Sequence, residues 1–306
     1  MVPSAEGAAT TASIAVIINP ISGTGGRLDV ARARAAKAAA LLAAHGADPS
    51  NVFITERAGH GREIALNAIG RGASTVVAWG GDGTMNEVGT AVAFTDVALS
   101  LVPSGSGNGL ARELNIPFDP DAAFETALRG RERIIDAGDI GGRLFFNVAG
   151  VGLDARVAHA FAVNGLQKRG FGRYLQLTMR ELAAYRPDVL TVSTPAGSTC
   201  KPSLLVAIAN GRQYGNGAVI APHAKLDDGR FDIVTISARS LLRASLELPF
   251  VFMGMVDRIA GVRIQTAESV DITSSSPIIY HLDGESIAGT LGVSARLRPR
   301  ALKVKC

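Results

Sequence analysis

The segment Gly80-Gly81-Asp82-Gly83-Thr84 follows directly on the apolar, β-branched run 75–79. Glycines in such a turn let backbone amides converge on a ligand, and a helix that begins after them adds positive potential. A strand that ends in glycines and leads into a helix is typical of layered α/β domains. The segment therefore predicts an α/β domain with an anion-binding turn at the carboxyl end of a strand.

Two more turns of this design occur in the first half of the chain. The apolar run 14–18 ends at Asn19-Pro20 and is followed by Ser22-Gly23 and more glycines, and the run 98–102 leads into the segment 103–109, Pro-Ser-Gly-Ser-Gly-Asn-Gly. One such turn is weak evidence, since glycines also serve ordinary tight turns. Three of them in one domain indicate a phosphate-bearing ligand. Neither the Walker nor the Rossmann glycine pattern is present, so the phosphate site is of another type.

The rest of the chain shows two different patterns of expected secondary structure. Helix-favouring segments at 29–45, 61–69 and 85–94, with a strand at 52–55, complete an alternating α/β pattern in the first part. Beyond about residue 131, helices are expected only at 154–163, 174–185 and 241–255. Short β-like runs dominate there, at 134–140, 144–148, 189–194, 204–209, 231–236, 270–273, 278–282 and 292–298. We expect an α/β domain over residues 1–135 and a mostly antiparallel β-sandwich over 136–306, with the last strand possibly returning to the first domain.

Composition excludes several classes of protein. The 306 residues are 47% hydrophobic, which excludes global disorder. Only Cys200 and Cys306 are present, so a disulfide scaffold is not expected. The longest strongly apolar run, 248–256, falls far short of the roughly twenty residues of a membrane helix, and residues 1–13 do not resemble a signal peptide. We expect a cytoplasmic protein. The net charge of +4 suits an anionic partner, but no reader motif indicates nucleic acid.

Three carboxylates are the candidate catalytic groups. Asp82 would bind a catalytic Mg²⁺ or orient an acceptor, because hard cations prefer carboxylate oxygens; the alternative is a cap on the helix expected near Met85. Asp283 and Glu285 flank a glycine between two β-like runs and would serve as a general base. An ordinary Asp-Gly hairpin is the alternative for that turn. Glu87 contacts the ligand or only complements the helix dipole.

Several polar residues are weaker candidates. Arg112 would reach a phosphate or lie on a solvated helix face, and Asn147 and Asp154 would face a cleft between the domains as substrate-binding residues. His60 would bond a phosphate or cap a helix. For the remaining histidines, including His281, structural roles are preferred, and the basic run Arg27, Arg32, Arg34 and Lys37 is interpreted as a solvated helix face.

Six motifs occur together in this chain: Asn19-Pro20-x-Ser22-Gly23, Thr55-x-x-x-Gly59-His60, Gly80-Gly81-Asp82-Gly83-Thr84-x-Asn86-Glu87, Pro103-x-Gly105-Ser106-Gly107-Asn108, Asp227-Asp228-Gly229 and Asp283-Gly284-Glu285. In this combination and order the chain resembles the diacylglycerol kinase catalytic-domain family, which includes bacterial soluble lipid kinases and the sphingosine and ceramide kinases. Gly-Gly-Asp-Gly alone is shared with NAD kinases and phosphofructokinases. The resemblance covers residues 14 to about 305.

The resemblance implies a phosphofructokinase-like α/β domain, a β-sandwich domain, and ATP- and Mg²⁺-dependent phosphorylation of a lipid hydroxyl. A structural Mg²⁺ is implied at the loop 225–230, with the Asp228 carboxylate and the Lys225 and Arg230 carbonyls as ligands. A carboxylate of Asp283-Gly284-Glu285 is implied as the base. The implied ATP-binding positions, with the rest of their turns, are Asn19, Ser22, Gly23, Thr55, Gly80, Gly81, Asp82, Gly83, Thr84, Asn86, Glu87, Ser106, Gly107 and Asn108.

The identity of the molecule that accepts the phosphate is left open. Gly109 stands where bacterial diacylglycerol kinases commonly have Asp, which looks more like sphingosine kinase, so diacylglycerol, a sphingoid base or a related lipid is expected. The alternatives are a soluble-metabolite kinase related to NAD kinase and a catalytically silent lipid-binding protein of the same fold.

Contact with a membrane would be peripheral, at the inner surface. Lys168, Arg169, Phe171, Arg173 and Tyr174 interleave basic and aromatic side chains that suit an anionic headgroup layer. The apolar helix expected within 241–256 would line a lipid entrance, or would be a core helix of the second domain. Acyl chains are expected in an apolar pocket of that domain, and a homodimer is left open.

Overall fold

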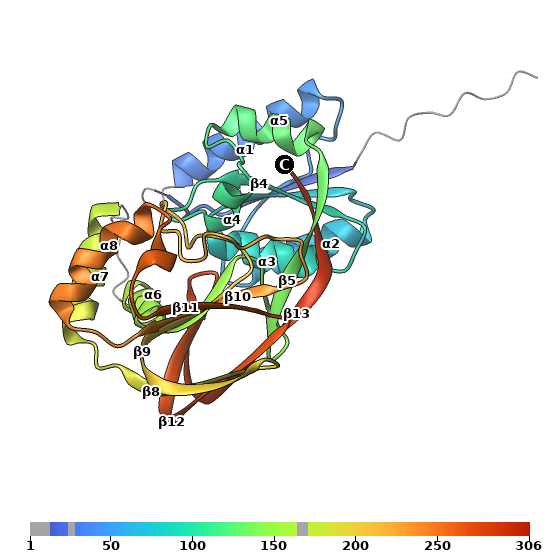
Figure 1. The fold of residues 1–306 in the computed structure, drawn as a ribbon. Helices are drawn as coiled ribbons and strands as arrows, with labels where there is room; N and C mark the ends of the chain where they lie inside the picture. Colours follow the sequence, from blue (N-terminus) through green and yellow to red (C-terminus); the bar gives the residue numbers. More distant parts are fainter. Residues whose placement is uncertain (1–12, 24–27, 164–170) are drawn as a thin grey trace, which may run out of the picture.

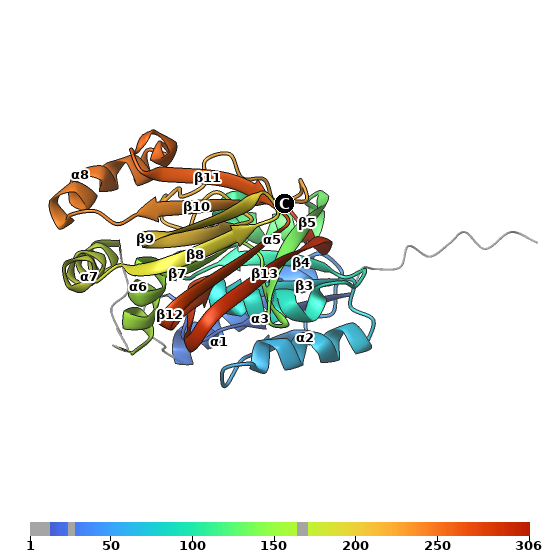
Figure 2. The same cartoon turned by 60° about the horizontal axis from the view of Figure 1, so that its bottom comes forward.

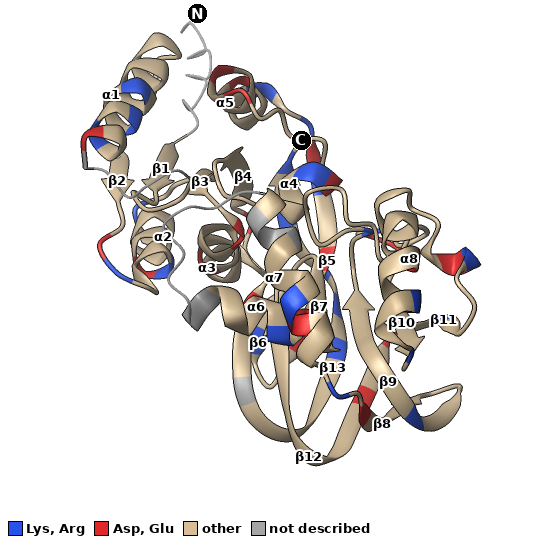
Figure 3. Cartoon of the chain, turned by 90° about the vertical axis from the view of Figure 1, so that its left-hand side faces the viewer, with Lys and Arg blue, Asp and Glu red and all other residues tan. Residues whose placement is uncertain are grey.

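The computed structural model describes residues 13–23, 28–163 and 171–306. In its first part, four parallel strands are ordered β4-β3-β1-β2. Helices α1 and α5 cover one face of this sheet, and α2 and α3 cover the other (Figure 3). The elements are β1 (Ile14–Ile18), α1 (Leu28–Ala44), β2 (Val52–Ile54), α2 (His60–Gly70), β3 (Thr75–Gly80), α3 (Asp82–Val92), β4 (Ala98–Pro103), α4 (Gly109–Glu113) and α5 (Pro120–Arg129).

The central strands are apolar along their whole length because helices bury both of their faces. Every residue of β1, β3 and β4 is buried, as is usual for parallel strands in α/β proteins. Helix α3 begins at Asp82, earlier than the residue 85 that the sequence suggested. Helix α5 was not expected, although its start carries a clear signal: the Asp119 carboxylate accepts a hydrogen bond from Ala122 N, and Pro120 stands at the first helical position.

The second part is mainly antiparallel (Figure 1). The expected runs 270–273 and 278–282 form one long strand, whereas the run 144–148 is divided between two strands. The elements are β5 (Glu132–Ile140), β6 (Arg143–Phe145), β7 (Val148–Gly152), α6 (Leu153–Val163), α7 (Phe171–Ala184), β8 (Asp188–Thr194), β9 (Gly197–Ala209), β10 (Phe231–Ser237), α8 (Leu241–Phe252), the 3₁₀ helix η1 (Val256–Arg258), β11 (Val262–Ala267), β12 (Ser269–Leu282) and β13 (Glu285–Lys305).

The long strand β13 belongs to both parts of the molecule (Figure 2). It pairs antiparallel with β12 and β5, and its far end pairs parallel with β4 through Val304 and Leu99. The strand β5 runs through residue 135, so the expected domain boundary lies inside a strand that accompanies β13 from one part to the other. The two halves are therefore joined by continuous hydrogen-bonded sheet.

Three apolar cores hold these layers together. The first lies between the parallel sheet and its helices and includes Trp79 and Phe124. The second lies within the β-rich part, where the Phe145 and Phe231 rings stack with centroids 5.6 Å apart. The third lies between that sheet and the helices α6 and α8. No helix in the described ranges is long and apolar enough to cross a membrane.

Candidate active site

The first and third glycine turns, and the second and third, meet in backbone contact. A Cβ atom on Gly105 would lie 2.5 Å from the Cα atom of Gly81, and one on Gly23 would lie 2.7 Å from the carbonyl oxygen of Ser104. Gly23 also has a positive φ of 87°, which favours glycine. Side chains at these positions would separate the turns, so the glycines are required for the turns to gather at one edge of the sheet.

Polar side chains join the first turn to its neighbours. Asn19 Nδ2 donates to Thr84 Oγ1 at 2.8 Å, and Asn19 Oδ1 accepts from Ile21 N at 3.0 Å. The Ser22 and Ser104 hydroxyl oxygens lie 2.7 Å apart. The expected nucleotide residues of these turns are therefore brought together.

Arg34 also belongs to this site, which corrects the interpretation of its basic run as a solvated face. Its Nη1 lies 3.2 Å from Ser22 O and 3.4 Å from Asn19 O, and burial lowers the pKa of its guanidinium. The interpretation holds for Arg32, which is exposed. Helical spacing places Arg34 on the inner side of α1, but no sequence motif marks it.

Asp82 holds the third turn rather than capping its own helix. Its carboxylate accepts from Asn108 N at 2.8 Å and Gly109 N at 2.7 Å, at the start of α4, while the N-cap of α3 is Gly81 with no side-chain cap bond. The expected alternative, a cap near Met85, is wrong. Burial raises the pKa of Asp82 to about 6, against the effect of these two amides.

The third turn is closed by its own side chains. Asn108, in a left-handed conformation, accepts from Gly105 N at 2.9 Å through Oδ1 and donates to Gly105 O at 2.7 Å through Nδ2. Ser106 is exposed at the tip. Arg112, expected at a phosphate or on a solvated face, donates from Nε to Gly107 O at 3.0 Å and lies over the Phe118 ring. Arg112 therefore braces the turn from behind.

Glu87 organises the neighbouring helix rather than its own. Its two carboxylate oxygens accept from Gly59 N at 2.7 Å and Gly61 N at 2.9 Å, at the start of α2. The His60 ring accepts from Glu56 N at 3.1 Å, and Thr55 is buried where β2 ends. Glu87 therefore joins α3 to the motif Thr55-x-x-x-Gly59-His60 by hydrogen bonds.

The turn Asp283-Gly284 connects β12 to β13, and both residues have positive φ angles, 47° and 89°. It is therefore the Asp-Gly hairpin that the sequence allowed, but the aspartate points inward and is 9% exposed. Its Oδ1 accepts from Asn147 N and Val148 N, and its Oδ2 accepts from Phe146 N and Asn86 Nδ2. Burial raises the pKa of Asp283, and these four donors oppose that shift. All of its lone-pair directions are occupied.

Glu285, unlike Asp283, has a carboxylate that is not surrounded by hydrogen-bond donors among the described residues. Its carboxylate makes no hydrogen bond within the described residues, and its Oε1 lies 2.6 Å from the position that a Cβ atom on Gly83 would take. The residue as a whole remains exposed, while its carboxyl faces the start of α3. Burial of the carboxyl, and then the negative charges of Glu87 and Asp283, raise the pKa of Glu285. Glu285 is therefore the carboxylate of this turn that is free to accept a proton.

Asn147 and Asp154 lie on the second-domain side of this site. Asn147 Nδ2 donates to Gln213 O at 2.7 Å. Asp154, at the start of α6, accepts from the Tyr214 hydroxyl at 2.7 Å and contacts His281 Nε2 at 3.2 Å through Oδ2. Neither Tyr214 nor the contact of His281 was expected from the sequence, because each lies far along the chain from Asp154.

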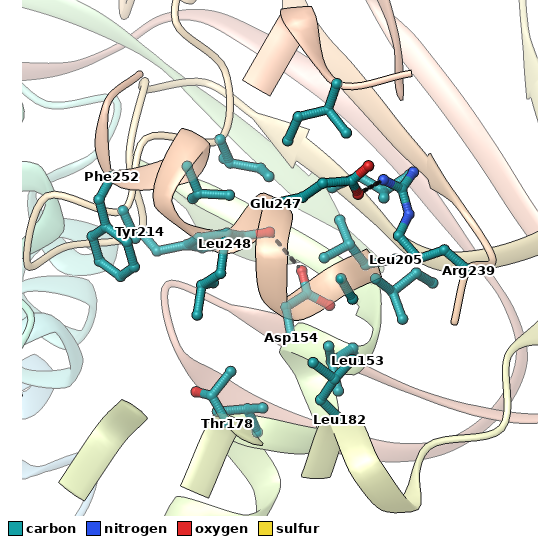
Figure 4. Close-up of a pocket in the computed structure, with 18 residues that line it drawn as sticks. Leu153, Asp154, Thr178, Leu182, Leu205, Tyr214, Arg239, Glu247, Leu248 and Phe252 are labelled. Carbon is teal, nitrogen blue, oxygen red and sulfur yellow. Dashed lines mark hydrogen bonds and ion pairs between the residues drawn. The ribbon is translucent and has the colours of Figure 1, made fainter. Parts of the chain in front are cut away.

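An apolar cavity of about 130 Å³ opens beside Asp154 (Figure 4). Its wall is formed by α6, α7, α8 and the strands β9 and β10, with Leu153, Leu182, Leu205 and Leu248 among the lining side chains. Its charged members pair with one another: Arg239 bonds Glu247, which also accepts from Arg243 Nε. The cavity thus has mostly apolar walls, and Asp154, bonded to the Tyr214 hydroxyl, lies in its wall beside the interdomain site.

The loop 225–230 carries the expected structural metal ligands. Asp228 is exposed and accepts from Arg230 N at 3.1 Å, whereas Asp227 pairs with Arg133. The buried Asp136 fastens this loop by accepting from Gly229 N at 2.8 Å. In the described ranges no three His, Cys, Asp or Glu side chains are grouped to hold a metal ion, so any cation here would depend on backbone carbonyls and water as well.

The basic and aromatic motif expected at a membrane surface lies beyond what the structure describes. Lys168 and Arg169 fall outside the described residues, and so do the side chains of Phe171, Arg173 and Tyr174.

Comparison with known proteins decides the family. Residues 13–140 match the diacylglycerol kinase catalytic domain, and residues 147–306 match the YegS C-terminal NAD kinase beta sandwich-like domain. A curated protein of Yersinia pestis, named "Probable lipid kinase YegS-like", is 31% identical over 244 residues, which are 78% of this chain and 81% of that protein. The chain belongs to the diacylglycerol kinase catalytic-domain family.

Membership in this lipid kinase family agrees with the fold. The structure of a diacylglycerol kinase from Bacillus anthracis covers 96% of each chain with a TM-score of 0.71 at 16% identity. An NAD kinase from Archaeoglobus fulgidus in complex with ATP aligns over 96% of this chain and 93% of its own, with a TM-score of 0.51 at 10% identity. Both likenesses show the fold alone. They confirm an NAD kinase-like α/β domain followed by an antiparallel β-sandwich domain.

Proposed function

We propose that this lipid kinase family member transfers the γ-phosphate of ATP to the hydroxyl group of a membrane lipid. The observation that carries the proposal is the apolar cavity, which is lined in part by Asp154, and Asp154 is connected through His281 to the turn that holds Glu285. A kinase for a soluble, charged acceptor would have no use for a cavity lined by leucines.

The glycine turns support binding of the ATP phosphates. Their amides gather at the carboxyl ends of β1, β3 and β4, where ligands of α/β sheets bind. Asp82 accepts one amide on each oxygen, which leaves a lone pair on each for a cation. An oxygen donor of this kind fits Mg²⁺ held mainly by phosphate oxygens and water. A bound Mg²⁺ would neutralise phosphate charge, while Asn19 and Arg34 fix the first turn.

Glu285 is the proposed general base. The four donors on Asp283 hold that carboxylate in place, whereas the Glu285 carboxylate has no such partner among the described residues. Its raised pKa brings its proton affinity closer to that suited to a base near neutral pH. Asp283 then acts as the anchor that sets the turn, and Glu285 receives the proton of the acceptor hydroxyl.

A second Mg²⁺ is proposed at the loop 225–230, with a structural role. The Asp228 carboxylate and the carbonyls of Lys225 and Arg230 form an all-oxygen donor set, which is the chemistry that Mg²⁺ prefers. The positive φ of Gly229, 75°, folds this loop tightly.

Contact with the inner membrane surface is proposed through α8. The inner side of this helix, with Leu248 and Val251, lines the cavity. Its outer side exposes Leu242 (72%) and Leu246 (68%), and Met253, directly after the helix, is 64% exposed. An apolar face above a lipid cavity suits insertion into the headgroup boundary of a bilayer.

The activity is tested with ATP labelled in its γ-phosphate, Mg²⁺ and a panel of diacylglycerol, a sphingoid base, phosphatidylglycerol and NAD, by following label into the organic phase for the lipids and into phosphorylated NAD in the aqueous phase. We expect a labelled lipid with the wild type and a loss of about 10²-fold or more with Glu285→Gln. The absence of any labelled lipid would overturn the proposal, and labelling of NAD alone would favour the soluble-metabolite kinase.

The membrane contact is tested by sedimentation with vesicles that contain phosphatidylglycerol. The pair Leu242→Glu and Leu246→Glu should abolish co-sedimentation, while turnover of a short-chain, water-soluble lipid stays within about twofold. The control, Leu66→Glu, makes the same change at a half-exposed leucine on α2. Equal co-sedimentation of the paired variant and the control would contradict the assignment.

A further inference from the structure

The side chains of Tyr214, Asp154 and His281 form a fixed unit at the wall of the cavity, and Figure 4 shows the first two with the hydrogen bond between them. The Tyr214 hydroxyl donates to Asp154 Oδ2 at 2.7 Å, and His281 Nε2 lies 3.2 Å from the same oxygen. The side chains of His281 and Asp154 are 3% and 9% exposed, and the Tyr214 and His281 ring centroids lie 5.7 Å apart. The burial of His281 and the two contacts at Asp154 Oδ2 hold these groups in one arrangement.

The second ring nitrogen of His281 reaches the turn that carries Glu285. Gly284 N donates to His281 Nδ1 at 3.3 Å. Nδ1 must therefore offer a lone pair, which puts the ring proton of the neutral imidazole on Nε2, where Asp154 accepts it. One imidazole thus connects a carboxylate in the cavity wall to the backbone of the catalytic turn.

Gly150 leaves the space in which this connection forms. In the sheet, Gly150 of β7 stands opposite His281 of β12. A Cβ atom at Gly150 would lie 2.1 Å from Asp154 Oδ2 and 2.9 Å from His281 Nε2. Because its φ is not positive, the backbone at this position would accept alanine, and only the contact between the two side chains demands glycine.

The same unit borders the nucleotide side of the site. The carbonyl oxygen of Tyr214 lies 2.8 Å from where a Cβ atom on Gly109 would stand, and Gly109 N donates to Asp82. Tyr214 therefore packs against the third glycine turn with its backbone while its hydroxyl bonds Asp154. The unit lies between the cavity, the Asp82 turn and the Glu285 turn.

We propose that His281 is a positioning residue that couples the acceptor site at Asp154 to the turn that presents Glu285. This rests on the proposed function, and it takes Asp154, in the wall of the cavity, as the residue that contacts the polar head of the lipid. When a hydroxyl head group bonds Asp154, it strengthens a set of contacts that already runs through His281 Nε2 and Nδ1 to Gly284 N. The bound acceptor thereby holds the turn that presents Glu285 more tightly.

Two amide variants separate the two halves of this coupling. His281→Gln can place an NH₂ group near the Nε2 position and so keep a donor for Asp154, but it leaves Gly284 N without an acceptor. His281→Asn can keep an oxygen near the Nδ1 position for Gly284 N, but it does not reach Asp154. The control is His45→Gln, at the end of α1, where the histidine contacts Leu41 O and Glu125.

The kinetic test uses the panel lipid that the wild type labels fastest. We expect His281→Gln to lower kcat about tenfold with KM for the lipid within twofold, and His281→Asn to raise that KM about tenfold with kcat within twofold, since one hydrogen bond is lost in each case. A structural role alone would give both variants the same profile. Identical changes in kcat and KM, or none, would overturn the coupling.

The structural test follows exchange of the Gly284 amide hydrogen with solvent by NMR. In the wild type, dioctanoylglycerol or the labelled panel lipid should slow this exchange at least fivefold. In Gly150→Ala and in His281→Gln, the same lipid should leave the exchange rate of the Gly284 amide unchanged. Failure of the wild type to label any lipid contradicts the proposed function. If the wild type phosphorylates a lipid but the exchange rate of its Gly284 amide does not change when lipid is added, the coupling is contradicted and the proposed function is not.

Discussion

Asp283→Asn tests whether the buried aspartate of the catalytic turn is an anchor. The carboxylate accepts four hydrogen bonds, three of them from the successive amides of Phe146, Asn147 and Val148. Asparagine keeps an oxygen for two of these donors and turns an NH₂ group toward the other two. Each buried donor left unpaired costs about 1–3 kcal/mol, so the gross loss is roughly 2–6 kcal/mol. Removing a buried charge, whose pKa is raised by burial, offsets part of it.

We therefore expect the free energy of unfolding to fall by about 2–3 kcal/mol, measured by urea unfolding at neutral pH, and Tm to fall by roughly 5 °C. The matched variant is Glu285→Gln, which should stay within about 0.5 kcal/mol of the wild type while phosphate transfer falls. If Asp283→Asn is as stable as the wild type but inactive, and Glu285→Gln keeps its activity, the assignment of anchor and base is refuted.

Three further predictions concern the nucleotide turns and the metal loop. The pKa of the Asp82 carboxyl is 3.8 in the unfolded chain and about 6 in the folded chain, so its contribution to stability falls as the pH rises from 3.8 to 6. A titration midpoint of the Asp82 carboxyl carbon below about pH 4.5, measured by ¹³C NMR, would contradict this. Arg34→Lys should raise KM for ATP about fivefold with little change in kcat, because an ammonium cannot span the contacts with Asn19 and Ser22, and the exposed Arg32→Lys should change neither. Millimolar Mg²⁺ without nucleotide should raise Tm of the wild type and not of Asp228→Asn, and equal shifts would exclude a site at that loop.

The gathering of the glycine turns could be predicted from sequence because it depends on local chemistry. Parallel strands end at one edge of a sheet, so turns that follow β1, β3 and β4 must lie together there. The start of helix α5 has an equally local signal, with Asp119 at the N-cap and Pro120 at the first helical position. The sequence predicts two strands in place of β12 because Ser274-Ser275-Ser276 has the composition of a turn. In the structure Ser274 pairs with Leu190 of β8, and the pairing with β13 shifts register between Thr273 and Ile278, so the serines form an irregularity within one strand.

The partners of the candidate residues could not be predicted, because they are set by contacts distant in sequence. Whether Asp283 is an anchor or a base depends on the amides of residues 146–148, far earlier in the chain. For Asp82, the alternative to a role in catalysis was a cap on its own helix, whereas its carboxylate bonds the start of α4. In both cases the sequence indicated that a carboxylate mattered, and only the three-dimensional arrangement distinguished its role.

The shared strand β13 has a consequence for how the molecule is made. Val304 completes the parallel sheet beside Leu99, some two hundred residues earlier, so the first half cannot finish its sheet until synthesis has passed residue 304. Pairings of such long sequence separation form slowly. The first half must therefore wait, with the edge of β4 open, while the second half is translated. Folding of this kinase should be a single late event rather than two successive ones.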